Sequence, residues 1–171
     1  MKRLLIAISI AAVLLGVGVC DAQETAAFQT PNSVVVALYD AVTFPAGETP
    51  DWDHVRAMFI PEAVIVLRTS WEATSVFSLD GFVGDFVRFI EQAGVAEKGF
   101  SEKIVRKRSM VFGDIAHVLV LYEAHITGSP RPPQQGVDSI HLVQRDGRWW
   151  IASIVNEIPT AERPLPAEVG E

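Results

Sequence analysis

Apolar residues recur at helical spacing in three segments of the first half of the chain. The first segment begins after Thr30, whose side chain can cap a helix that has Pro31 in its first turn. The second is shorter, begins at Asp51 and stops at Pro61. The third follows Ser78, ends at Gly94, and carries one apolar face made of Leu79, Phe82, Val83, Phe86, Val87 and Ile90. The pattern therefore predicts three helices.

The remaining apolar segments are rich in β-branched and aromatic residues, which favours strands. Two short strands are expected at 63–69 and 71–77, and four long ones at 100–112, 115–127, 137–145 and 148–158. Gly113-Asp114 and Asp146-Gly147 are typical of hairpin turns, and 128–136 is a proline-rich loop. The order α-α-β-β-α-β-β-β-β predicts an α+β fold: three helices packed on a strongly curved antiparallel or mixed sheet of about six strands.

The N-terminal pattern differs from the rest of the chain. Lys2 and Arg3 precede a run from 4 to 19 in which Ser9 is the only polar residue. The run is shorter than a membrane-spanning helix requires, so it is typical of a secretory signal cleaved after Ala22. An uncleaved anchor and a lipid-modified Cys20 are the alternatives. We expect export to the periplasm or full secretion, with no membrane association after cleavage.

Composition and residue spacing indicate the domain organisation and argue against several classes of ligand and partner. The 171 residues divide into a signal peptide at 1–22, a flexible segment at 23–30, one domain at 31–159 and a flexible tail at 160–171. A formal charge of −7 gives no general attraction to nucleic acid, and the lone cysteine excludes an intramolecular disulfide. No histidine or acidic cluster has metal-ligand spacing along one element. We therefore expect no metal, no cofactor and no nucleic-acid partner.

Four sequence stretches resemble the NTF2-like superfamily, a family of α+β cones that includes ketosteroid isomerases, SnoaL-like cyclases and scytalone dehydratase. They are Leu38-Tyr39, the segment 51–63 from Asp51-Trp52-Asp53 to Pro61-Glu62-Ala63, the Phe112-Gly113-Asp114-Ile115-Ala116 turn and the segment 146–151 with Trp149-Trp150. The resemblance covers about 31–159 and implies a cone with a pocket. It says little about chemistry, because one fold hosts many activities.

The resemblance to ketosteroid isomerases also suggests individual site residues. Those enzymes use a carboxylate base together with a tyrosine and a protonated aspartic acid. Tyr39 and Asp138 match the positions of the tyrosine and of the protonated acid, but Leu67 fills the place of the base. Because leucine cannot accept a proton, the resemblance argues against an isomerase of that type. Scytalone dehydratase's histidine–tyrosine constellation finds no convincing match either.

Other polar residues are candidates from the strand alternation. Glu102 falls on the alternation of 100–112, and the resemblance to the isomerases maps it to a cavity-lining position, where burial would raise its pKa and allow acid–base chemistry. The structural interpretation is an ion pair of Arg106 with Glu102 or with Glu123. Asn156 is a candidate polar contact in the cone, and Arg68, with Trp71, a candidate at its rim.

The strand at 115–127 is apolar on one face and half apolar on the other. Periodicity places the even-numbered face inward, whereas the turn alignment with the isomerases places the odd face, with Glu123, toward the cavity; we favour the odd face slightly. Two apolar faces also suggest a homodimer through the sheet.

The favoured function is an exported domain that binds a small hydrophobic molecule. The alternatives are an acid–base isomerase, dehydratase or cyclase, or a protein-interaction module.

Overall fold

The computed structural model describes residues 26–70, 72–92 and 94–170. The expected signal peptide, with its cleavage position after Ala22, lies outside these residues, and so does Trp71. Within the described ranges, no helix has the length and apolar character needed to cross a membrane.

The three expected helices are present as α2 (Pro31–Val42), α3 (Trp52–Arg56) and α4 (Leu79–Gln92). Thr30 and Ser33 form a capping box at the start of α2, in which each side chain accepts a hydrogen bond from the other's backbone amide. The Asp51 side chain caps α3, and the Ser78 hydroxyl accepts from the Gly81 amide at the start of α4. A short helix, α5 (Ala167–Gly170), follows in the C-terminal segment.

Seven strands form one mixed sheet, one strand more than expected. They are β1 (Phe44–Pro45), β2 (Phe59–Arg68), β3 (Thr74–Ser78), β4 (Gly99–Phe112), β5 (Ile115–Ile126), β6 (Gln134–Arg145) and β7 (Arg148–Glu157), in the order β1-β4-β5-β6-β7-β2-β3. All neighbours are antiparallel except β2 and β7, which are parallel. The additional strand is β1, a two-residue edge segment that pairs Phe44 with Phe100.

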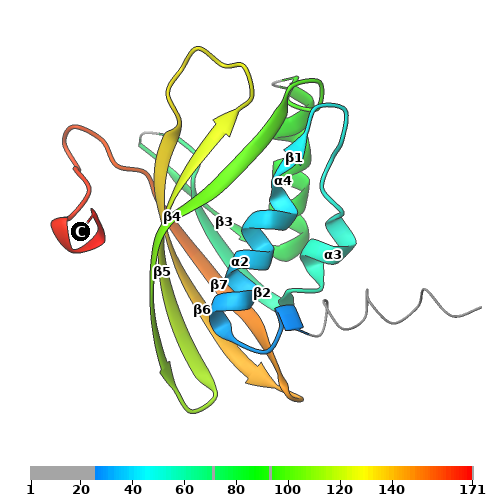
Figure 1. Cartoon of the computed structure of the whole chain (residues 1–171), viewed down its shortest axis with the longest axis vertical. Coiled ribbons are helices and arrows are strands. Elements are labelled where there is room, and N and C mark those ends of the chain that lie inside the picture. The colour runs from blue at the N-terminus through cyan, green and yellow to red at the C-terminus, as the bar shows by residue number, and fades with distance from the viewer. Residues whose placement is uncertain (1–25, 71, 93, 171) are drawn as a thin grey trace, which may run out of the picture.

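The sheet is strongly curved, and the helices α2, α3 and α4 all lie on one side of it (Figure 1). Register shifts interrupt two ladders: Val105 is the extra residue in β4 where it pairs with β5, and Ala152 is the extra residue in β7 where it pairs with β6. An extra residue at such a shift bends the strand and increases its twist. The bends let the sheet curl around α2 and α4, as the cone prediction requires.

The even-numbered face of β5 packs against the helices. Val118 and Val120 are fully buried in the same core cluster as Val34 and Val35 of α2, whereas Ile115 on the opposite face is 59% exposed. The slight preference for the odd face is therefore wrong. The fully apolar face turns inward because burying it removes more apolar surface from water than burying the half-apolar face would.

The shift in β4 also changes which of its residues share a face. Residues directly opposite each other on paired strands project to the same side of the sheet. Glu102 lies opposite Ala124 and therefore projects inward, whereas Arg106, beyond the shift, lies opposite Leu121 on the outer face. An uninterrupted alternation predicts Glu102 and Arg106 on the same face of β4. The prediction of an ion pair between these two residues is therefore wrong.

Candidate functional site

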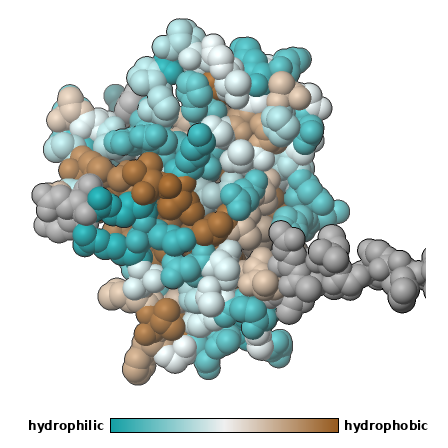
Figure 2. All heavy atoms as spheres, in the orientation of Figure 1, coloured by the Kyte–Doolittle hydropathy of each residue, from teal (hydrophilic) through white to brown (hydrophobic). Residues whose placement is uncertain are grey.

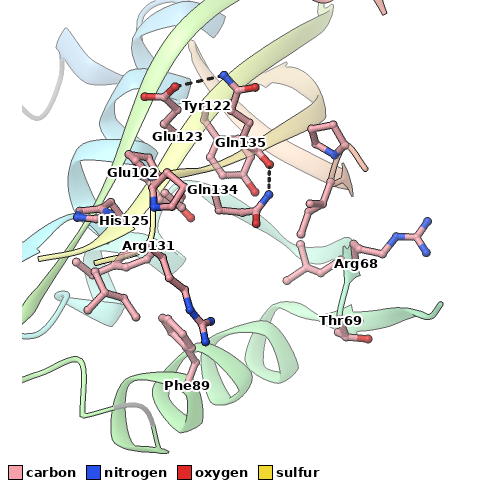
Figure 3. A pocket seen from close by; sticks show the side chains of 18 of the residues that line it. Arg68, Thr69, Phe89, Glu102, Tyr122, Glu123, His125, Arg131, Gln134 and Gln135 are labelled. Carbon is pink, nitrogen blue, oxygen red and sulfur yellow. Dashed lines mark hydrogen bonds between the residues drawn. The ribbon is translucent and has the colours of Figure 1, made fainter. Parts of the chain in front are cut away.

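A pocket with a volume of about 1340 Å³ opens at one end of the cone, between α4, the β5–β6 loop and the ends of β4 and β5. Figure 3 shows Phe89 of α4 on one side of the pocket and Glu102, Tyr122 and Gln134 on the sheet side. The apolar lining includes Leu67, Phe82, Phe86, Phe89, Phe100, Ala124 and Ile126. The pocket also extends to the C-terminal segment at 158–165.

Aromatic rings from α4 and β4 form one wall of the pocket. Phe86 contacts Phe82, Phe89 and Phe100 edge-on, with ring centroids 6.1, 5.9 and 5.7 Å apart. Residues three and four apart lie on one face of a helix, so the α4 sequence itself places Phe82, Phe86 and Phe89 together. Edge-to-face packing is favourable and holds the rings in place. The result is an apolar wall on preorganised secondary structure.

A hydrogen-bonded cluster lies on the inner face of the sheet, beside the pocket. The Tyr39 hydroxyl of α2 donates to Asp138 Oδ2 over 2.6 Å, and Asn156 Nδ2 donates to Asp138 Oδ1 over 2.7 Å. The same Asn156 nitrogen lies 3.0 Å from the Tyr122 hydroxyl oxygen. Asp138 and Asn156 face each other across β6 and β7, and Val120 faces Asp138 from β5. The cluster therefore connects α2 with three neighbouring strands.

Protonation in this cluster follows from burial and hydrogen bonding. Burial raises the pKa of Asp138, while the hydrogen bonds from Tyr39 and Asn156 act in the opposite direction. Burial, and next the negative charge of Asp138, raise the pKa of Tyr39 far above its ordinary value. Tyr39 therefore keeps its proton and acts as a donor. Asp138 receives a donor at each oxygen, which is the arrangement of an ionised carboxylate.

The Glu102 side chain lines the pocket, and no hydrogen bond joins its carboxyl group to another described residue. Its backbone is fixed by Thr43, whose hydroxyl accepts from the Glu102 amide at 2.9 Å and lies 3.2 Å from its carbonyl oxygen. Burial, with a smaller contribution from the charge of Asp138, raises the pKa of Glu102 to about 8. At neutral pH Glu102 is therefore a protonated carboxylic acid, able to donate a hydrogen bond into the pocket.

Tyr122 separates the pocket from the hydrogen-bonded cluster. It lines the pocket, and its ring centroid lies 5.7 Å from that of Tyr39. A Cβ atom at Gly136 would lie 2.4 Å from the Tyr122 Cζ and hydroxyl oxygen atoms. The ring therefore lies directly over Gly136, on the neighbouring strand, and only glycine leaves room for it.

The arrangement combines a neutral acid with an ionised carboxylate. Glu102, whose pKa is raised to about 8, can give a proton, and the carboxylate of Asp138 can accept one. The pocket lining does not include Tyr39, Asp138 or Asn156, however. A ligand in the pocket would therefore contact Glu102 and Tyr122, and not these three residues. Among the described residues, no group of three or more His, Cys, Asp or Glu side chains could hold a metal ion.

No protein-family model matches this chain, and no curated protein matches it either. Solved structures do match. An NTF2-like protein of unknown function from Pseudomonas putida KT2440 superposes with a TM-score of 0.62 at 11% identity, covering 83% of this chain and 94% of that one. The chain has the NTF2-like fold.

Two further NTF2-like matches carry names that refer to dehydration. A candidate scytalone dehydratase from Novosphingobium aromaticivorans DSM 12444 gives a TM-score of 0.56 at 14% identity, covering 75% of this chain and 81% of that one. A candidate dehydratase of the NTF2-like family from Streptomyces avermitilis gives 0.57 at 14% identity, with 76% and 94% covered. At these identities the likeness concerns the fold.

Within the NTF2-like fold, the seven predicted site residues fall into three groups. Tyr39, Asp138 and Asn156 meet in the hydrogen-bonded cluster, and Glu102 lines the pocket beside it. Arg68 and Glu123 lie at the pocket edge, where Arg68 forms an ion pair with Glu157 and Glu123 accepts from Gln135 Nε2 at 3.3 Å. Arg106 lies on the outer face, and no ion pair joins it to Glu102 or Glu123 in the described part of the chain.

Several residues of the site were not among the sequence candidates. Tyr122 was assigned to an apolar face without a role, and the phenylalanines of α4 were treated as core. Gly136 in a long strand was the available signal for Tyr122, since an interior glycine often marks a close approach by another group. Leu67, the residue in the place of the isomerase base, does line the pocket.

We predict that the Glu102→Gln variant is more stable than the native protein at high pH. Because the folded state disfavours ionised Glu102, the native protein loses stability as pH rises from about 4.5, the ordinary pKa, to about 8. Near pH 8 the variant should be more stable than the native protein by on the order of 4 kcal/mol, with little difference at about pH 4.5. Urea unfolding at both pH values measures this, and Glu62→Gln, at an exposed position, is the control. A difference independent of pH would contradict the assignment.

We also predict that Gly136→Ala and Gly84→Ala change stability in opposite directions. The alanine Cβ at 136 would displace the Tyr122 ring and break its contact with Asn156, at a cost of about 2 kcal/mol. At 84, within α4, the nearest atom to the new Cβ lies 3.6 Å away, so alanine should stabilise by about 0.5–1 kcal/mol. Denaturant unfolding measures both, and a neutral Gly136→Ala would contradict the proposed position of Tyr122.

Proposed function

We propose that this protein binds a small, largely apolar molecule in the pocket, with Glu102 as the polar group that orients it. The observation that carries the proposal is an unpartnered carboxylic acid, protonated at neutral pH, in a pocket with an aromatic wall. Small-molecule sites combine an apolar wall with polar groups that fix the ligand's orientation, and this pocket has both kinds of lining residue. A ligand carbonyl or hydroxyl oxygen would accept a hydrogen bond from the Glu102 carboxylic acid, while the rest of the molecule contacts the phenylalanines.

A second candidate function is acid–base catalysis by a lyase or isomerase without a cofactor. The observation that favours it is the pairing of neutral Glu102 with ionised Asp138, together with the names of the two dehydratase-like structures. Glu102 would protonate a leaving or carbonyl oxygen. We favour binding because both oxygens of Asp138 already accept hydrogen bonds behind Tyr122, and because Leu67 occupies the place of the isomerase base.

We further propose that the protein is exported to the periplasm or secreted and forms a homodimer through the outer face of the sheet. Export is supported by the apolar run at 4–19. The dimer is supported by exposed apolar side chains on that face, which include Met110, Phe112, Ile115 and Val155. Figure 2 shows hydrophobic side chains gathered at the lower end of the molecule, over the β4–β5 turn. The rings of His117 and His141 stack at 5.0 Å on the same face.

We expect the pocket to bind 2-acetylnaphthalene, a neutral ketone, more tightly than 2-ethylnaphthalene, which lacks the carbonyl. Displacement of the fluorescent naphthalene ketone prodan measures both affinities. Glu102→Gln keeps a donor and should preserve the preference, whereas Glu102→Leu should weaken ketone binding about fivefold. Ketone affinity should also fall as pH rises through about 8, where Glu102 loses its proton.

Failure of both probes to bind would contradict the small-molecule proposal. Equal affinities for the two probes would contradict the role of Glu102. The enzyme alternative predicts instead that Glu102→Gln abolishes turnover of a substrate, because an amide cannot deliver the proton.

Native mass spectrometry of the protein purified from its exported compartment tests export and assembly together. We expect a dimer whose subunits begin at residue 23, with additional mass where a ligand is retained. Met110→Lys should yield monomers, because Met110 is 70% exposed on the proposed interface. Val111→Lys is the control, since the neighbouring Val111 is 55% exposed but lies opposite Ala116, on the inner side of the sheet. A monomer at all concentrations, or a chain that retains residues 1–22, would contradict the respective proposal.

A further inference from the structure

The loop between β5 and β6 carries a single arginine within a proline-rich sequence, Ser129-Pro130-Arg131-Pro132-Pro133. Proline fixes its own φ angle and restricts the preceding residue to extended conformations, so the backbone on both sides of Arg131 is restrained. The base of the loop is held by a hydrogen bond from the Thr127 amide to the Gly99 carbonyl oxygen at 3.1 Å. The Ser129 hydroxyl accepts from the Arg131 amide at 3.2 Å. The loop therefore holds Arg131 in a defined place.

That place is the mouth of the pocket. Arg131, Pro132 and Pro133 all line the pocket. Figure 3 shows the Arg131 side chain extending from the loop in the direction of α4, and both Arg131 and Phe89 line the pocket. A cation at this position contacts the end of any molecule whose apolar body lies against the phenylalanine wall.

The other charged groups around the pocket have partners. Arg88 forms an ion pair with Asp85 at 2.9 Å, and Arg68 forms one with Glu157. Glu123 accepts a hydrogen bond from Gln135. By contrast, Arg131 forms no ion pair with any described residue. Glu123 keeps its negative charge, because Gln135 is a neutral amide, and Arg131 is the arginine of the lining that no described carboxylate compensates.

We infer that the ligand of this pocket is an organic acid: an apolar molecule with a carboxylate at one end, bound by Arg131, and a carbonyl or hydroxyl at the other, bound by Glu102. The inference rests on the proposed binding function. Arginine presents a planar set of donors that matches a carboxylate, and charge-assisted hydrogen bonds are stronger than neutral ones. The neutral state of Glu102 fits the same ligand, because a protonated acid adds no negative charge to a pocket that receives an anion.

The test compares two ketones of the same shape. 6-Acetyl-2-naphthoate carries a carboxylate at the end of the ring system opposite the ketone, and 2-acetylnaphthalene does not. We expect the carboxylate compound to displace prodan from the native protein at about fivefold lower concentration. Arg131→Gln should remove this difference in affinity between the two ketones. Raising the ionic strength from about 0.05 M to about 0.5 M should also reduce the difference.

Arg145→Gln is the matched control, because Arg145 is exposed at the opposite end of β6, next to the β6–β7 turn, and does not line the pocket. It should retain the full preference for the carboxylate. If 2-acetylnaphthalene binds and the carboxylate compound binds no more tightly, the organic-acid inference is wrong and the small-molecule function stands. If Arg131→Gln leaves the preference intact, Arg131 is not the residue that recognises the acid. If neither compound binds, both proposals are overturned.

Discussion

The carboxylate of Asp138 is the group on which the arrangement of this site depends. Placing a charge on the inner face of a sheet is unfavourable unless hydrogen bonds replace its hydration, and Tyr39 and Asn156 each provide one. These bonds connect α2 to β6 and β7, and Asn156 continues to Tyr122. The negative charge of Asp138 also adds to the burial that raises the pKa of Glu102. One buried carboxylate therefore links helix packing, ring position and the protonation of its neighbour.

The pocket has three parts that different elements supply. The aromatic wall comes from α4 and β4, the polar floor from Glu102 and Tyr122, and the positive mouth from the β5–β6 loop. Each part lies on a restrained backbone: a helix and strands for the first two, and a proline-flanked segment for the third. A site of this kind orders its ligand with little loss of side-chain freedom in the protein, which favours selective binding.

The site candidates show which side-chain positions a local pattern places and which it does not. Tyr39, Glu102, Asp138 and Asn156 were selected by strand alternation and by resemblance to the isomerases, and the structure brings them to the same region of the inner face. Arg106 was grouped with Glu102 because an unbroken alternation was assumed. The register shift between Ile104 and Arg106 inserts a residue, and every later side chain of β4 then changes face.

The sequence by itself determined the helices and most strand positions, because capping residues, apolar spacing and turn glycines act over a few neighbouring residues. Thr30, Asp51 and Ser78 begin their helices in the structure as their chemistry predicts. Only the tertiary structure decided which face of β5 turns inward, where β4 shifts register and how Tyr122 lies over Gly136. These features depend on contacts between segments far apart in the chain, whose free energies no local pattern records. The protonated state of Glu102 belongs with them, since burial and the charge of Asp138 exist only once the cone has formed.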